Sequence, residues 1–352
     1  MHSIWKGIAS LAFAATVAGG PAKAQELQPF TVGFAIDSMV QQIPYHVARE
    51  YGYFKEEGLD VSFEYFDGSS AVVQQIVAGN VDAGSPSTGA LFNAVVQGHK
   101  LKQVFSFQYK SVFTLATPVS SGIKDVKDLK GKAIGVSELS GGEVPVVRAV
   151  LREANLIEGE DVQILPIGDA PAMTVNALQT DQVQAYSSNM FDIAAIQAAG
   201  IPMTVILPES IANFPGNSMV VREEVLNDKR KQLEGFTRAI SKAVVYVAAN
   251  RDEAYALAAK LAPEEFENEA LGQASFDAAI TLRERPAAME GQPIGAHYMP
   301  GTQAYHDFMR QGKEEEGALM QDLDLNALLD SSLLEAANSF DKTKAALPRA
   351  QQ

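Results

Sequence analysis

The sequence contains no cysteine, and its single tryptophan is Trp5. Without cysteine the chain can form neither a disulfide nor a thiolate metal site. It also lacks the residue to which a bacterial lipoprotein attaches its lipid, so we expect no lipid anchor. Trp5 lies in an N-terminal segment that we expect to be removed, so no tryptophan should stack on a ligand.

Basic residues are also scarce. Lysine and arginine together number 28 against 43 aspartates and glutamates, which gives a formal net charge of −15 at pH 7. A charge this negative disfavours contact with nucleic acids and with anionic membrane surfaces. We therefore expect no nucleic-acid partner and no membrane insertion.

Long apolar runs are missing after the N-terminus. Residues 1–6 include Lys6, residues 7–20 are apolar and small, and residues 21–24 read Pro-Ala-Lys-Ala. This order predicts a secretory signal peptide over residues 1–24, cleaved after Ala24. The apolar run is shorter than the roughly 20 residues that span a bilayer. The alternative is a buried N-terminal helix, but the run shows no alternating polar face. We expect a free protein in a bacterial periplasm.

Motifs of common enzymes are absent as well. The sequence has no GxSxG, HExxH or GxxxxGK[ST] pattern. The histidines after the signal segment are scattered and lack partners at metal-ligand spacing, at positions His46, His99, His297 and His306. We expect no enzyme activity, no metal and no cofactor.

Short apolar strands and amphipathic helices alternate along the first two thirds of the chain, which predicts an α/β fold with mixed sheets and flanking helices. After residue 223 the pattern is mainly helical. The length exceeds one ordinary domain, so we expect two lobes. The predicted boundaries are 25–117 with 218–340 for the first lobe, 118–217 for the second lobe, and 341–352 for a flexible tail.

Three segments carry a family resemblance. They read Gly52-Tyr-Phe-Lys-Glu-Glu-Gly-Leu-Asp-Val61, Gly79-Asn-Val-Asp-Ala-Gly84 and Asp125-Val-Lys-Asp-Leu-Lys-Gly-Lys-Ala-Ile-Gly-Val136. Together they resemble the nitrate/sulfonate/taurine-type solute-binding family of ABC transporters, which also includes thiamine-pyrimidine binders. Shorter matches extend the resemblance in the family's order over nearly the whole chain after residue 24. They are Pro44-Tyr-His-Val-Ala48, Ser140-Gly-Gly142, Asp322-Leu-Asp-Leu-Asn326 and Asp330-Ser-Ser-Leu-Leu334.

The resemblance implies a type II-like periplasmic-binding-protein clamshell, in which two lobes joined by two crossing strands hold a ligand in a cleft. It implies a monomer that delivers a small polar organic ligand, sulfonate/taurine-like or pyrimidine-like, to an ABC permease and ATPase on separate chains. One alternative is a periplasmic sensor component that presents its ligand to a receptor. Another is an enzyme like the fungal thiamine-pyrimidine synthases, but these depend on a cysteine-rich segment that this chain lacks.

The ends of the predicted strands carry the candidate site. In open α/β sheets, ligands bind beyond the carboxyl ends of strands, where helix N-termini expose unpaired N–H groups. Small hydroxyl residues and glycines let a ligand approach that backbone closely. Each of these residues could instead serve as an ordinary cap or turn. The candidate ligand-binding residues are Asp37, Ser38, Met39, Ser69, Ser70, Ser85, Ser87, Thr88, Tyr109, Ser137, Ser140, Gly141, Gly142, Asp169, Ser187, Asn189 and Phe214.

Four of these residues bear on the ligand's chemistry. A carboxylate at Asp37 would repel nitrate or a sulfonate and would suit an amino group, a pyrimidine edge or a hydroxyl. Alternatively, Asp37 only caps the next helix. Asp169 could likewise contact the ligand from the second lobe, or it could only form a turn before Pro171. Tyr109 and Phe214 are the aromatic residues expected to stack on a flat ligand.

Overall fold

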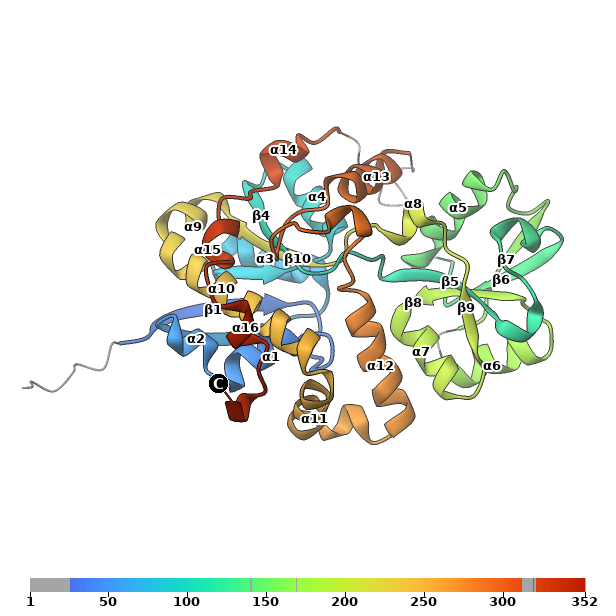
Figure 1. The fold of residues 1–352 in the computed structure, drawn as a ribbon. Coiled ribbons are helices and arrows are strands. Elements are labelled where there is room, and N and C mark those ends of the chain that lie inside the picture. Colours follow the sequence, from blue (N-terminus) through green and yellow to red (C-terminus); the bar gives the residue numbers. More distant parts are fainter. Residues whose placement is uncertain (1–25, 140, 169, 312–318, 320, 352) are drawn as a thin grey trace, which may run out of the picture.

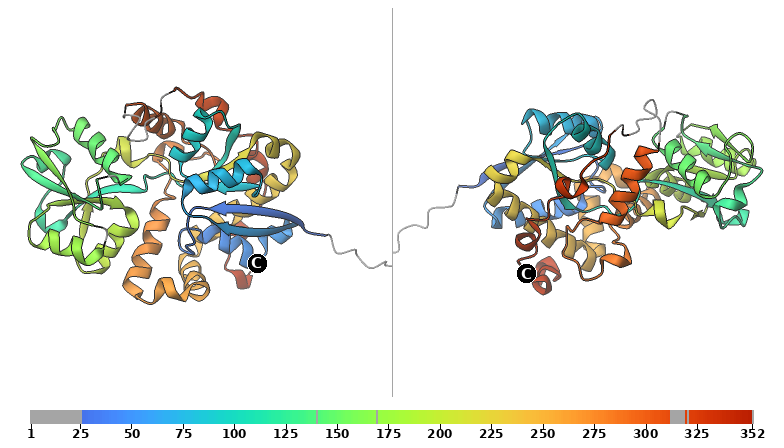
Figure 2. Two further views of the ribbon diagram at one scale, coloured as in Figure 1. Left: turned by 180° about the vertical axis from the view of Figure 1, so that it is seen from behind. Right: turned by 90° about the horizontal axis from the view of Figure 1, so that it is seen from above.

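The structure is a computed structural model that describes residues 26–139, 141–168, 170–311, 319 and 321–351. The predicted signal peptide, Ser140 and Asp169 lie outside the described residues. The described chain forms two α/β lobes lying side by side (Figures 1 and 2). None of the helices described in these ranges is long and apolar enough to cross a membrane.

The first lobe is built on a five-stranded sheet of order β2-β1-β3-β10-β4. β1 runs parallel to β2 and β3, whereas β10 is antiparallel to both of its neighbours. β1 buries Phe30, Val32 and Phe34 on one face, and on its other face Thr31 is half-buried and Gly33 is covered, as expected for a central strand between β2 and β3. The strands are β1 (Gln28–Phe34), β2 (Leu59–Tyr65), β3 (Ala83–Ser85), β4 (Leu101–Ser106) and β10 (Ser218–Arg222).

The second lobe repeats this arrangement in the order β7-β6-β8-β5-β9. β6 is parallel to β7 and β8, and β5 is antiparallel to β8 and β9. The chain therefore changes sheets twice, through residues 107–112 and 206–217, which we call the crossing segments. Residues 113–117, assigned from sequence to the first lobe, lie in β5 of the second sheet. The strands are β5 (Phe113–Pro118), β6 (Lys132–Val136), β7 (Val162–Pro166), β8 (Ala185–Asn189) and β9 (Met203–Val205).

Helices cover both faces of each sheet. Between α1 and α2 the chain turns at Gly52, whose φ of 78° lies in the left-handed region that suits glycine. The helices between strands are α1 (Ile43–Glu50), α2 (Tyr53–Glu56), α3 (Ser69–Ala78), α4 (Thr88–Val96), α5 (Glu143–Glu153), α6 (Pro171–Gln179), α7 (Met190–Ala198) and α8 (Glu209–Ala212). Short 3-10 turns in this part are η1 (Val119–Ser121) and η2 (Val126–Leu129).

The chain after β10 is helical, as expected, and α10 packs on α1 and α2 of the first lobe. α12 also reaches the second lobe, where it packs against α7 (Figure 1). Beside this contact is a crevice of about 300 Å³, lined by residues of both helices and by Thr114 and Val205. The elements are α9 (Glu223–Asp228), α10 (Arg230–Ala249), α11 (Arg251–Leu261), η3 (Pro263–Phe266), α12 (Glu269–Thr281), η4 (Ala287–Met289), α13 (Met299–Arg310), α14 (Leu325–Leu328), α15 (Leu334–Ala337), α16 (Lys342–Ala345) and η6 (Arg349–Gln351).

The segment beyond Asp341, expected from sequence to be a flexible tail, contains α16. The Asp341 carboxylate accepts a hydrogen bond from the Lys344 N–H at 3.1 Å and so caps this short helix. Ala345 is buried, and the Asn250 side chain donates to the Ala346 carbonyl at 2.9 Å. These contacts attach the C-terminal segment to α10 and the first lobe.

Candidate ligand-binding cleft

The carboxyl ends of the parallel strands point toward the crossing segments in both lobes. In the first lobe, the Asn217 side chain donates to the Ser85 carbonyl at the end of β3 at 3.1 Å. In the second lobe, Phe113 begins β5 directly after a crossing segment and pairs with Asn189, the last residue of β8. Because the two crossing segments join the lobes, these two sheet edges face each other. We call the region between these two edges the cleft.

The loop that follows β1 at the cleft edge is occupied by a carboxylate from another part of the chain. Glu265 of η3 accepts hydrogen bonds from the Met39 N–H at 2.6 Å and from the Val40 N–H at 3.2 Å. The Ser38 hydroxyl donates to the same carboxylate at 3.2 Å. The donors of Ser38 and Met39, predicted to meet a ligand, are therefore bonded within the chain.

Asp37 is exposed next to this loop, and within the described ranges its carboxylate makes no hydrogen bond or ion pair. It does not cap α1, whose N-cap is Gln42 without a side-chain cap bond. Burial raises the pKa of Tyr65 at the end of β2, and the nearby charges of Asp37 and Glu265 raise it further against the opposing effect of Arg49. Two carboxylates, of Asp37 and Glu265, and the Arg49 guanidinium therefore lie near the end of β2.

The serines and threonine after β2 and β3 connect neighbouring loops. The Ser87 hydroxyl caps α4 by accepting from the Ala90 N–H at 3.4 Å, and the Ser87 N–H donates to the Ser69 hydroxyl at 3.0 Å. Thr88 is buried and donates to the Gly216 carbonyl of a crossing segment at 2.9 Å. Ser85 is buried at the end of β3, whereas Ser70 is exposed.

In the second lobe, Glu143 at the start of α5 folds back over the loop that follows β6. Its side chain is only 3% exposed and accepts hydrogen bonds from the Ser137 N–H, at 3.0 Å, and from the Ser137 hydroxyl. Gly141 lies against this carboxylate. A Cβ at Gly142 would lie 2.6 Å from the Phe113 ring, so glycine permits the close approach of this loop to β5.

The end of β8 presents a second carboxylate. The Asn189 side chain caps α7 by accepting from the Phe191 and Asp192 N–H groups at 2.9 and 3.0 Å. Its amide donates to the Asp192 carboxylate at 2.7 Å, and the Ser188 hydroxyl donates to the same oxygen. Ser187 is fully buried and donates to the Thr114 carbonyl, so its hydroxyl faces β5.

Both aromatic candidates are packed inside the protein. The Tyr109 hydroxyl donates to the carbonyls of Ser106 and Ala296 at 3.0 and 3.1 Å, and burial raises the pKa of Tyr109 to about 12. The Phe214 ring lies 5.2 Å from the Tyr305 ring, centroid to centroid, and is buried. This packing leaves little surface of either ring for a ligand.

Comparison with known proteins agrees with this architecture. A family model described as "NMT1/THI5 like" matches residues 40–254. The chain belongs to this family. The family resemblance read from the sequence is thereby confirmed.

Three relatives of this NMT1/THI5-like chain are informative. The riboflavin-binding protein RibY of Chloroflexus aurantiacus is 26% identical over 257 residues, which cover 72% of each chain. The 4-amino-5-hydroxymethyl-2-methylpyrimidine phosphate synthase of Schizosaccharomyces pombe is 32% identical over 96 residues, 26% of this chain and 28% of that one. The aliphatic sulphonate binding protein SsuA of Escherichia coli superposes with a TM-score of 0.63 at 17% identity, covering 86% and 97% of the two chains. The last match confirms the expected periplasmic-binding-protein fold.

Apolar side chains also line the cleft edges of this NMT1/THI5-like chain. Ile36 follows β1, Leu139 follows β6, and Met173 lies in the first turn of α6; their exposed fractions are 48%, 54% and 55%. These side chains offer apolar surface beside the polar groups of the strand ends, a combination that sites for organic ligands use. No group of three or more His, Asp or Glu side chains in the described part of the chain is arranged to hold a metal ion.

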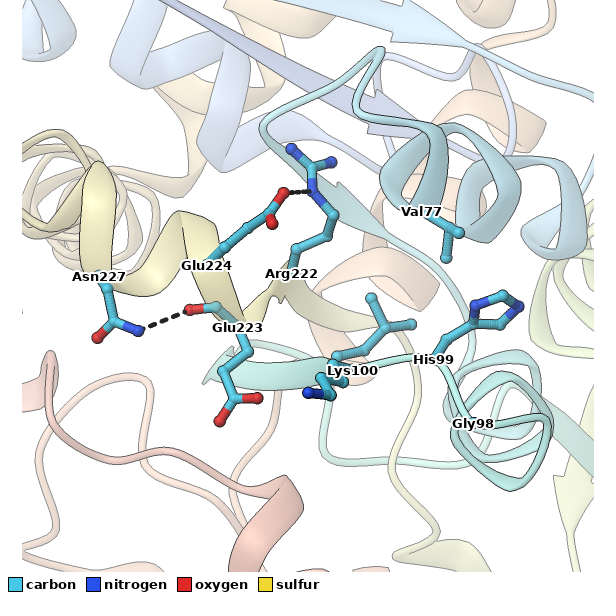
Figure 3. A pocket seen from close by; sticks show the side chains of 9 residues that line it. Val77, Gly98, His99, Lys100, Arg222, Glu223, Glu224 and Asn227 are labelled. Atoms are coloured by element: carbon cyan, nitrogen blue, oxygen red, sulfur yellow. Dashed lines mark hydrogen bonds and ion pairs between the residues drawn. The ribbon is translucent and has the colours of Figure 1, made fainter.

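A larger cavity of about 510 Å³ lies elsewhere (Figure 3). It is lined by Leu101 at the start of β4 and by Arg222 at the end of β10. Since β10 is antiparallel to β3, this cavity lies at the end of the first sheet that faces away from the cleft. It contains none of the predicted ligand-binding residues.

Sequence reasoning missed three carboxylates of the cleft edges. Asp192 follows Asn189 by three residues, the spacing of a capping motif, so it could have been found. Glu143 follows the Gly141-Gly142 pair at the start of a predicted helix, which is a weaker local signal. Glu265 has no local signal, because its partners Met39 and Val40 lie more than 200 residues away in the sequence.

Proposed function

We propose that this protein is a solute-binding protein, which captures a small polar organic molecule between its two lobes and delivers it to an ABC permease and ATPase. The observation that carries this proposal is the pair of matching sheets whose strand ends face each other across two crossing segments. A ligand that contacts both edges binds the closed arrangement better and shifts the population toward it. The closed form would then be the one that docks on the permease.

We propose that the crossing segments, residues 107–112 and 206–217, act as the hinge. The change of sheet between Ser106 and Phe113, and again between Val205 and Ser218, supports this. The Thr88 bond to Gly216 attaches one crossing segment to the first lobe. We further propose a monomer that is exported to the periplasm by a signal peptide cleaved after Ala24.

Of the two ligand classes, we favour a pyrimidine-like molecule over a sulfonate or taurine. Asp37 carries an exposed carboxylate that pairs with no described residue, and Ile36 and Leu139 offer apolar surface on opposite lobes. A flat heterocycle with amino or hydroxyl groups can use both features. The relative RibY, named for riboflavin binding, supports a heterocyclic ligand.

A thermal-shift screen of the purified protein tests the proposal. The panel comprises taurine, alkanesulfonates, nitrate, aminopyrimidines, riboflavin, aromatic carboxylates and small amines. A ligand at 100 times its Kd should stabilise the fold by about 2.7 kcal/mol. The absence of a shift with every compound would contradict a binding function. Chemical conversion of the bound compound during long incubation would contradict a function limited to binding and delivery.

A further inference from the structure

The loop after β1 has the form of an anion site that already holds an anion. The N–H groups of two consecutive residues, Met39 and Val40, and the Ser38 hydroxyl all donate to the Glu265 carboxylate. Converging backbone N–H groups of this kind bind anionic ligands in many proteins. Here the anion belongs to the chain itself.

In the described part of the chain, no side-chain cation forms an ion pair with this carboxylate. Within the described ranges, no Lys, Arg or His nitrogen lies within 4.0 Å of a Glu265 oxygen. Two arginines near this loop bond to other groups: Arg283 donates to the carbonyls of Gln41 and Ala279, and Arg49 pairs with Glu50 at 3.5 Å. The neighbouring Asp37 adds a second negative charge instead.

We propose that Glu265 is a specificity-determining residue that excludes anions from the first-lobe side of the cleft. It occupies the donors that a sulfonate, nitrate or carboxylate would need, and its charge repels such a group at close range. The bound ligand must therefore present a neutral or cationic group to this loop. The inference rests on the proposed function, because it takes the cleft to be where the ligand binds.

The test compares Glu265→Ala with wild type and with Glu264→Ala. Glu264 is the exposed neighbour, so its removal changes the net charge equally without freeing the loop donors. Methanesulfonate and acetate are the probes, and dimethyl sulfone is the neutral control at equal ionic strength. Binding is measured by calorimetry, and stabilisation by the shift in melting temperature.

We expect Glu265→Ala to bind methanesulfonate at least tenfold more tightly than wild type does. Acetate should also raise its melting temperature, because acetate can replace the missing carboxylate on the Met39 and Val40 N–H groups. Neither probe should stabilise wild type or Glu264→Ala, and dimethyl sulfone should stabilise none of the three. Glu265→Gln keeps a hydrogen-bond acceptor for the loop but removes the charge. It replaces the alanine variant if that variant does not fold. It too should bind methanesulfonate more tightly than wild type does.

Two results would overturn the inference. The first is a wild-type affinity for methanesulfonate equal to that of Glu265→Ala. The other is an equal gain of affinity in Glu264→Ala, which would make the effect one of net charge. If wild type binds an aminopyrimidine or riboflavin while neither Glu265 variant gains anion affinity, only this inference fails. If the Glu265 variants gain anion affinity while wild type binds nothing in the screen, the inference stands and the proposed function fails.

Discussion

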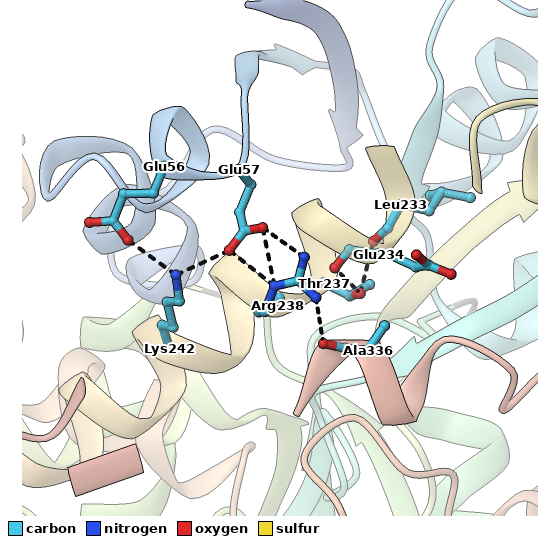
Figure 4. Close-up of polar contacts among 8 residues, drawn as sticks. All are labelled: Glu56, Glu57, Leu233, Glu234, Thr237, Arg238, Lys242 and Ala336. Atoms are coloured by element: carbon cyan, nitrogen blue, oxygen red, sulfur yellow. Dashed lines mark hydrogen bonds and ion pairs between the residues drawn. The ribbon is translucent and has the colours of Figure 1, made fainter. Parts of the chain in front are cut away.

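Replacing Arg238 should lower the stability of the protein without weakening ligand binding. Arg238 on α10 donates to both Glu57 oxygens, with distances of 3.1, 3.1 and 2.8 Å, and to the Ala336 carbonyl at 2.9 Å (Figure 4). Lys242 also bonds to Glu57, at 3.1 Å. This cluster connects the segment after α2 to α10 and α15, on the side of the first lobe away from the cleft.

The size of the effect follows from burial. Exposed ion pairs contribute about 0.2–1 kcal/mol, whereas breaking a buried pair and leaving one charge unpaired costs about 3–5 kcal/mol. The side chains of Arg238 and Glu57 are 24% and 12% exposed, and Lys242 would still pair with Glu57. We therefore expect Arg238→Ala to reduce the free energy of unfolding by about 2 kcal/mol at pH 7.

The effect should depend on pH. Burial alone would raise the pKa of Glu57, but the hydrogen bonds from Arg238 and Lys242 outweigh it and lower the pKa below its usual value. A carboxylate with a lowered pKa stabilises the fold above its unfolded pKa, about 4.3, and this contribution is lost as the pH falls through the folded pKa. The difference between Arg238→Ala and wild type should shrink at low pH.

Urea unfolding at pH 7.0 and pH 3.5 measures both effects, with Arg230→Ala as the control. Arg230 forms a more exposed pair with Glu234 on the same helix and should lose less than about 1 kcal/mol. Equal losses for the two arginine variants would refute the burial argument. If Arg238→Ala loses the same free energy of unfolding at both pH values, the role of Glu57 is refuted. If Arg238→Ala binds ligand more weakly than wild type, this cluster is not independent of the cleft.

Three further predictions concern single side chains. Asp37→Asn should change stability by less than about 0.5 kcal/mol yet weaken an amine or aminopyrimidine ligand about tenfold in calorimetry; unchanged affinity would exclude a ligand contact. Thr88→Val should cost about 1–3 kcal/mol in urea unfolding because it leaves the buried Gly216 carbonyl without its donor, whereas Thr88→Ser should not. Burial, and to a smaller extent the Arg49 charge, lower the pKa of His46 to about 3. Below about pH 6.5, His46 therefore binds a proton in the unfolded chain but stays neutral in the folded protein. Wild type should therefore lose about 2 kcal/mol more than His46→Gln between pH 7 and pH 5, and parallel losses would show that His46 is not protonated on unfolding.

Most of the fold could be read from local patterns. The strands and helices of both sheets follow from apolar periodicity and from turns, as at Gly52 and in the Gly79-Asn80 pair that ends α3. The helix caps Ser87 and Asn189 could be predicted as small polar residues at strand ends. The bond of Ser87 to the Ser69 hydroxyl and that of Asn189 to Asp192 could not be predicted. The division of the helical segment after residue 223 into α9 and α10 is a detail that depends on packing.

Only part of the candidate site could be predicted from the sequence. Sequence reasoning located the strand ends that face the cleft, because helix starts after parallel strands share one edge of a sheet. It could not tell which donors remain free for a ligand. The bonds of Ser38 and Met39 to Glu265, and the burial of Tyr109 and Phe214, depend on contacts between segments far apart in the chain.

The sequence by itself determined the class of the fold, the two-lobe organisation and the family, since these depend on periodicity, turn chemistry and segment order along the chain. The tertiary structure decided the order of strands in the two sheets, the contact of α12 with α7, and the partner of each polar group at the cleft edges. Such contacts form when distant segments bury a common surface, and the neighbouring residues in sequence carry no record of which partner is chosen. Glu265 is the clearest case, because an unremarkable acidic residue after α11 acquires its role only when folding brings it to the loop after β1.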